Sequence, residues 1–129
     1  MNFTTSSGIE FEIADEWWNF AEMNTFSRGE RTGYAYNGST EIREVPIAEI
    51  EPPARDPGLE HFKKCRMVPI LLAFRCVDAL PPVEIQPLRT SSSYRFSVYD
   101  GFHRYYASIA AGFTDLPVVI VNPPSPGDE

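Results

Sequence analysis

A short polar cluster near the end of the sequence has residue types that could hold an anion. The stretch reads VYDGFHRYYASIAAGF, with Gly101 at its bend and His103 and Arg104 immediately after it. Strand-forming residues precede the glycine and helical spacing follows it. The first N–H groups of a helix lack an intrahelical acceptor and, with the helix dipole, favour negative charge. Arginine adds a planar fork that matches phosphate oxygens. The cluster therefore predicts a phosphate site.

The same residues also fit a purely structural interpretation, and their spacing alone does not separate the two. Asp100 could cap the helix, Arg104 could be solvated, and His103 could be a core histidine with its hydrogen bonds satisfied. One glycine with one histidine and one arginine is a weaker signal than a complete P-loop.

The elements that must position this cluster are predicted from periodicity. Alternating residues over 83–88 and 94–99 indicate two strands joined by a polar turn. A helix then follows, with apolar side chains at i, i+3, i+4, i+7 and i+11 and Gly112 as its stop; these are Phe102, Tyr105, Tyr106, Ile109 and Phe113. Residues 117–121 read as a buried strand.

The N-terminal half is predicted to begin with a strand at residues 8–13 and a helix from Asp15, its cap, to Met23. In that helix Trp17, Phe20 and Ala21 share one face, and Trp18 points elsewhere. Residues 24–40 read as a loop, with Asn37-Gly38 as a hairpin turn before a strand within 41–50.

A helical pattern in two parts then runs from Pro57, with Pro69 in the first turn of the second part. Cys65 and Cys76 are expected to be buried, reduced thiols. Strands and helices mix in an α+β manner, which is the fold class we expect.

Charge and composition limit the function classes. The 129 residues carry a net charge of −7, which argues against a protein that binds nucleic acid over its whole surface. Residues 1–50 hold nine acidic and three basic residues, whereas residues 55–104 hold five acidic and eight basic ones, so local anion binding is permitted. The two histidines and two cysteines lack zinc-site spacing, and we expect no metal site. No apolar run is long enough to span a bilayer, and a cytoplasmic location is expected.

The segment DGFHRYYASIAAGFTDLPVVIV resembles the second half of the ParB/sulfiredoxin-like fold. There, a Gly-X-His-Arg or Gly-Glu-Arg-Arg box opens a helix that is followed by a glycine and a Pro-Val-rich strand. The segment VPIAEIEPPARDPG is similar to the first strand and loop of that fold, with Arg55 at the loop arginine. The resemblance covers about residues 43–121, and it is specific only in the box.

The resemblance implies binding of nucleotide phosphates, as in the CTP switch of ParB proteins, the ATP site of sulfiredoxins and the ADP or ATP site of free-serine kinases. By this resemblance, the phosphate-binding residues are Gly101, Phe102, His103, Arg104 and Arg55. The nucleotide is left open, with a nucleoside di- or triphosphate and Mg²⁺ as the candidate. Sulfiredoxins place a cysteine where Phe102 stands, so their nucleophilic chemistry is excluded.

Three functions follow as hypotheses. The first, which we adopt, is a ParB-like, DNA-associated binding module that holds a nucleotide or nucleic-acid phosphate and acts as a homodimer. The second is a phosphoryl-transfer enzyme, either a nuclease or a small-molecule kinase, with Glu51 or Asp56 as the base. The third is a scaffold whose anion site is vestigial. The basic side chains of the helical segment, Lys63, Lys64, Arg66 and Arg75, fit either non-specific DNA contact or a solvated face.

The expected domain organisation has three parts. Residues 1–40 form an N-terminal strand-helix extension and loop, residues 41–122 form the ParB/sulfiredoxin-like domain, and residues 123–129 form a flexible tail. The two adjacent tryptophans of the extension fit either the core of one chain or a dimer contact.

Overall fold

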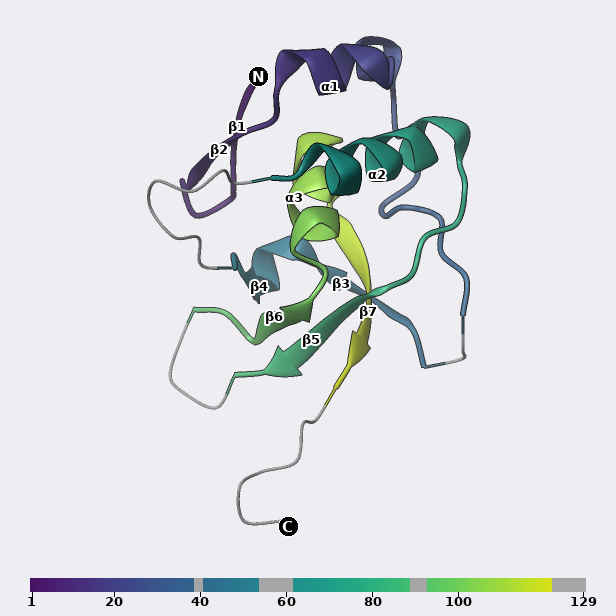
Figure 1. Cartoon of the computed structure of the whole chain (residues 1–129). Coiled ribbons are helices and arrows are strands. Elements are labelled where there is room, and N and C mark those ends of the chain that lie inside the picture. The colour runs from purple at the N-terminus through teal and green to yellow at the C-terminus, as the bar shows by residue number, and fades with distance from the viewer. Residues whose placement is uncertain (39–40, 54–61, 89–92, 122–129) are drawn as a thin grey trace.

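A five-stranded mixed sheet and the helices on one of its sides make up the fold (Figure 1). The computed structural model describes residues 1–38, 41–53, 62–88, 93–121. The sheet has the order β3-β7-β5-β6-β4. Its strands are β3 (Arg43–Pro46), β4 (Ile50–Glu51), β5 (Val83–Pro87), β6 (Phe96–Asp100) and β7 (Asp115–Ile120). The expected α+β class is confirmed.

The centre of the sheet is apolar because its middle strands are rich in β-branched residues. Val83 of β5 lies opposite Val118 of β7 in a parallel pair, and both side chains are fully buried. Strand β6 pairs antiparallel with β5 and parallel with β4. A helix follows strand β6 directly, so the Asp100-Gly101 bend lies where the sheet meets the helical layer.

Two helices cover the sheet, namely α2 (Lys64–Cys76) and α3 (Phe102–Ala110). Helix α3 is anchored by two buried tyrosines. The Tyr105 hydroxyl donates to the carbonyl of Ile50 at 3.3 Å, and the Tyr106 hydroxyl donates to that of Pro53 at 2.9 Å. These bonds fix the start of α3 relative to β4 and the segment that follows it.

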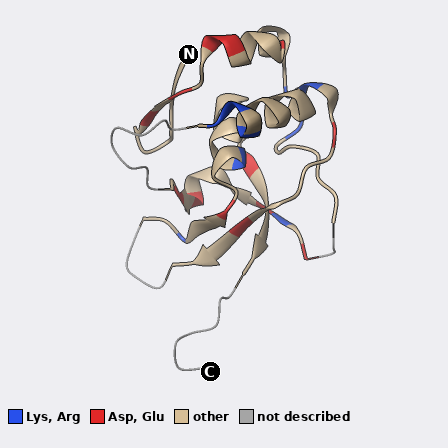
Figure 2. Cartoon of the chain, viewed as in Figure 1, with Lys and Arg blue, Asp and Glu red and all other residues tan. Residues whose placement is uncertain are grey.

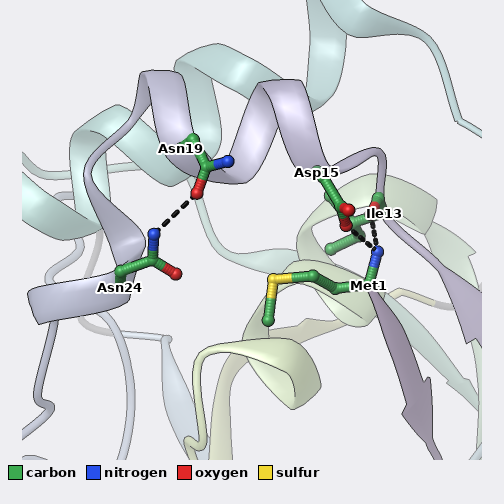
Figure 3. Close-up of polar contacts among 5 residues, drawn as sticks. All are labelled: Met1, Ile13, Asp15, Asn19 and Asn24. Atoms are coloured by element: carbon green, nitrogen blue, oxygen red, sulfur yellow. Dashed lines mark hydrogen bonds and ion pairs between the residues drawn. The ribbon is translucent and has the colours of Figure 1, made fainter.

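The first residues form a hairpin of β1 (Asn2–Thr4) and β2 (Glu10–Glu12), followed by α1 (Asp15–Phe20) and the 3-10 turns η1 (Met23–Thr25) and, later, η2 (Ile47–Glu49). Figure 3 shows the Met1 amino group donating to the Ile13 carbonyl at 2.7 Å and to Asp15. Asn24 donates to Asn19 at 2.6 Å. Asp15 was expected to cap α1, but Ala14 holds the cap position and Asp15 pairs with the amino group instead.

Other sequence expectations need correction. Trp18 and Ala21 are buried and Trp17 packs against the core, whereas Phe20, expected to share a face with Trp17 and Ala21, is 67% exposed. The hairpin expected at Asn37-Gly38 runs into residues 39–40, which lie outside the described residues; on either side of them, Tyr36 makes an isolated bridge with Leu80 and β3 pairs with β7.

Helix α2 also differs from its prediction. It is one continuous helix with Pro69 in its interior, whereas the sequence predicted two helical parts with Pro69 in the first turn of the second. Pro69 is tolerated because it lies on the exposed face, where water can solvate the carbonyl that loses its helical partner. Cys65 and Cys76 lie on the same outer side, and both are free and exposed rather than buried.

The end of α2 carries a strained residue that predicts a stabilising substitution. Val77 has φ 58° in the left-handed region. It is 56% exposed, so removing its side chain would lose little packing. A β-branched side chain is unfavourable there, whereas glycine is the usual residue at this position. We expect Val77→Gly to stabilise the fold by about 1 kcal/mol. Thermal unfolding should show a higher Tm for this variant and a smaller gain for Val77→Ala; an equal gain in both would contradict the argument.

Candidate anion-binding site

The bend between β6 and α3 depends on a glycine for two reasons. Gly101 has φ 120°, a conformation that residues with a side chain rarely adopt. A Cβ at this position would also lie 2.9 Å from Cγ1 of Val83. The backbone therefore turns tightly over the central strand β5, and α3 begins directly above the sheet.

The first turn of α3 presents backbone donors. The Tyr105 N–H is the first to bond within the helix, donating to the Gly101 carbonyl at 2.9 Å. No side chain of the described residues caps this end. The N–H groups of Phe102, His103 and Arg104 precede this bond, so they have no intrahelical acceptor and can meet an anion.

An open cavity of about 360 Å³ adjoins this turn. Helix α2 contributes Arg66 and Ile70 to its lining, its cap residue Lys63 adds a third side chain, and the bend contributes residues 100–104. Figure 2 shows basic residues gathered where α2 and α3 begin. Because Lys63 and Arg66 are exposed at this opening, the cavity combines backbone donors that lack an intrahelical acceptor with two solvent-accessible cations.

His103 connects the two helices. Its Nε2 accepts a hydrogen bond from the backbone N–H of Lys63 at 3.0 Å. The ring also packs edge-on against Phe62 and Phe102. Burial lowers the pKa of this imidazole, and the charges of Arg66 and Lys63 lower it further, so the ring is neutral at pH 7.

Arg104 makes contacts within the protein. Its Nη1 donates to the carbonyls of Pro81 at 2.9 Å and Pro82 at 2.8 Å, and its Nη2 lies 3.8 Å from a carboxylate oxygen of Asp100. The Tyr34 hydroxyl donates to the same Pro81 carbonyl at 2.6 Å. Burial raises the pKa of this hydroxyl, although Arg104 acts in the opposite direction. Arg104 thus holds the segment before β5 against α3 while it lines the cavity.

The structure brings together part of the expected site. Gly101, Phe102, His103 and Arg104 line one cavity, whereas Glu51 is exposed at the end of β4 and is not part of that lining. Arg55 and Asp56 lie outside the described residues. The roles expected for all of these residues stay predictions.

Sequence reasoning placed Lys63 and Arg66 on a basic helical face, not in the phosphate site. The sequence feature that could have indicated their role is that both lie at the start of a helix, three residues apart. The sequence does not show that this start meets the start of α3. Among the described residues no cluster of three or more potential metal-ligating side chains occurs, and none of their helices is long and apolar enough to cross a bilayer.

Fold and cavity together define an α+β domain with a basic cavity at a strand–helix bend. A family model, the ParB N-terminal domain, matches residues 32–128. The chain therefore belongs to the ParB N-terminal domain family.

The chain is also similar to solved structures. One of them is the crystal structure of the C-terminally truncated chromosome-partitioning protein ParB from Caulobacter crescentus complexed with CTP-gamma-S. The match has 20% sequence identity and a TM-score of 0.48, and it covers 65% of this chain and 46% of that chain. Among curated proteins, none matches the chain.

Proposed function

We propose that this chain is a binding module for the phosphate groups of a nucleotide, which it holds in the cavity between the starts of α2 and α3. The observation that carries the proposal is the meeting of uncapped N–H groups of α3 with Lys63 and Arg66 at one opening. Membership in the ParB N-terminal domain family supports the same function.

The chemistry of the cavity favours a polyphosphate over a single carboxylate. Backbone N–H groups bind one phosphate at the helix start. Arg66 can bind a second in a bidentate manner, while Lys63 acts as a mobile point charge. Asp100 is the one carboxylate among the described residues of the lining, and it suits a Mg²⁺ ion that arrives with the nucleotide.

A nucleic-acid backbone offers the same phosphate chemistry and is the second ligand to test. Lys63, Lys64 and Arg66 are exposed at the start of α2 and could contact several phosphates. Such contacts lose affinity steeply as salt rises, because counterions are released on binding. We favour the nucleotide because the α3 donors lie within a cavity rather than on a convex surface.

The test is calorimetric titration of the protein with CTP, ATP, GTP and UTP in the presence of Mg²⁺, and with short duplex DNA. We expect Arg66→Ala to weaken nucleotide binding about ten-fold, since one charge-assisted hydrogen bond contributes about 1.5 kcal/mol. Its Tm should stay near that of the unchanged protein because Arg66 is exposed.

Arg75→Ala is the matched control. Arg75 is an exposed arginine of the same helix, in its last turn, and it does not line the cavity. It should bind nucleotides within about two-fold of the unchanged protein. Equal losses in both variants would mean a diffuse charge effect, and no binding of any ligand would end the proposal. Following nucleotide hydrolysis and DNA cleavage in the same samples tests the phosphoryl-transfer alternative with Glu51 or Asp56 as the base.

A further inference from the structure

The hydrogen bond from Lys63 to His103 fixes the chemical form of the imidazole. The Lys63 N–H donates, so Nε2 must carry a lone pair and the ring proton must be on Nδ1. A protonated imidazole has no acceptor, so it cannot make this bond. The bond joins residues 40 positions apart in the sequence, and it spans the starts of α2 and α3.

The ring is held in place by its neighbours. Phe62, which is 4% exposed, lies 5.6 Å from the His103 ring by centroids, and Phe102 lies 5.4 Å away. Phe62 directly precedes Lys63, so the aromatic contact and the hydrogen bond hold the same short segment. A different χ1 rotamer of His103 would have to break both.

We propose that His103 is a positioning residue whose neutral imidazole aligns the start of α2 with the start of α3, so that Lys63 and Arg66 face the α3 donors. This inference rests on the proposed phosphate site, but it assigns the imidazole to holding α2 rather than to contacting phosphate. The residues that contact the anion are then Lys63, Arg66 and the backbone of α3.

The charges around the ring determine how this link responds to pH. Lys63, the cap of α2, and Arg66 in its first turn line the same cavity as the ring, as do Asp100 on the bend and Arg104 in the first turn of α3. Burial, Arg66 and Lys63 all lower the His103 pKa. The folded state therefore binds fewer protons than the unfolded state below about pH 6.5, and the stabilisation is complete above that pH and lost as pH falls toward the folded pKa.

Three substitutions separate positioning from direct phosphate binding. His103→Gln keeps an acceptor near the Nε2 position but does not titrate. His103→Lys adds a cation to the cavity but has no acceptor, and His103→Ala has neither. We expect His103→Ala and His103→Lys to weaken nucleotide binding by roughly five- to ten-fold at pH 7.5, the equivalent of one hydrogen bond, and His103→Gln to restore most of the affinity.

A second measurement needs no ligand. Nitrogen-15 NMR of the full chain should show the Nδ1–H tautomer at pH 7.5 and loss of the Lys63 amide hydrogen bond as the ring protonates. Unfolding free energy should fall on acidification more in the unchanged protein than in His103→Gln.

The outcomes are distinct. Binding by His103→Lys at least as tight as that of the unchanged protein would overturn the inference, since charge would then matter and the acceptor would not. An Nε2–H tautomer, or His103→Gln as weak as His103→Ala, would overturn it too. Failure of every nucleotide to bind would end the proposed function but leave the tautomer and the Lys63 bond testable by NMR.

Discussion

Gly101→Ala is expected to destabilise the fold by about 3 kcal/mol. Part of that cost is backbone strain, because φ 120° is a conformation that alanine rarely adopts. The remainder is overpacking: the new methyl group would meet three side-chain atoms of Val83 at 2.9 to 3.2 Å. Val83 is fully buried in the central strand, so it has little room to move. Urea unfolding monitored by circular dichroism measures the loss.

Gly112→Ala is the control that separates the two contributions. Gly112 also has a positive φ, 91°, but a Cβ there would have no neighbour within 4 Å. Its substitution should cost only the strain, about 1 to 2 kcal/mol. Adding Val83→Ala to Gly101→Ala should cost less than the sum of the two single changes, because it removes the methyl groups that clash. Equal losses for Gly101→Ala and Gly112→Ala would show that packing against Val83 contributes nothing.

The same substitution connects fold to function. In the proposed site the bend at Gly101 sets the direction of the α3 N–H groups, so a shifted bend should weaken nucleotide binding even where the chain remains folded. Nucleotide titration of Gly101→Ala at low temperature, where most of the protein is folded, tests this. Unchanged affinity would mean that the α3 donors do not contact the ligand.

The C-terminal part of the fold could be predicted well from local sequence. Periodicity placed the strands β5, β6 and β7 and the helix α3 within a few residues, because each has a strong apolar pattern and a glycine or proline boundary. The N-terminal prediction was poorer. Phe20 was grouped on one face with Ala21, yet Ala21 is buried and Phe20 is exposed, and Asp15 was assigned to a cap that Ala14 occupies. In a short helix the tertiary contacts decide the buried face, and the sequence does not contain them.

Only part of the candidate site could be predicted, again because tertiary contacts are not contained in the local sequence. The glycine bend is a local signal, since a strand, a glycine and a helix follow one another in the chain. The meeting of Lys63 with His103 spans 40 residues and depends on how α2 packs on α3. Arg104 is a residue type that often binds phosphate, but its carbonyl partners, Pro81 and Pro82, come from a distant segment. The residue type predicted a positive charge at this position, but only the packing of the chain shows that Arg104 donates to these carbonyls.

Arg104→Ala is expected to cost about 2 kcal/mol of stability. The guanidinium donates to two backbone carbonyls, its side chain is only 16% exposed, and hydrogen bonds from charged groups contribute about 1.5 to 3 kcal/mol. Nucleotide binding should weaken together with stability, because the segment before β5 loses its attachment to α3. In contrast, Arg66→Ala should weaken binding at unchanged stability. If Arg104→Ala lost affinity with no loss of stability, the guanidinium would be acting as a direct phosphate ligand, as its sequence position first suggested.

Two companion variants show which contact carries the effect. Arg104→Met keeps the apolar stem without the donors, so it should recover the packing but not the hydrogen bonds. Tyr34→Phe removes the other donor to the Pro81 carbonyl and should cost about 1 kcal/mol. Because Tyr34 and Arg104 share this acceptor, losing both should cost more than the sum of the single losses. Each single variant leaves the Pro81 carbonyl one donor, whereas the double variant leaves neither. Strictly additive losses would mean that the two side chains act on α3 independently, and the Pro81 carbonyl would not be the point at which they couple.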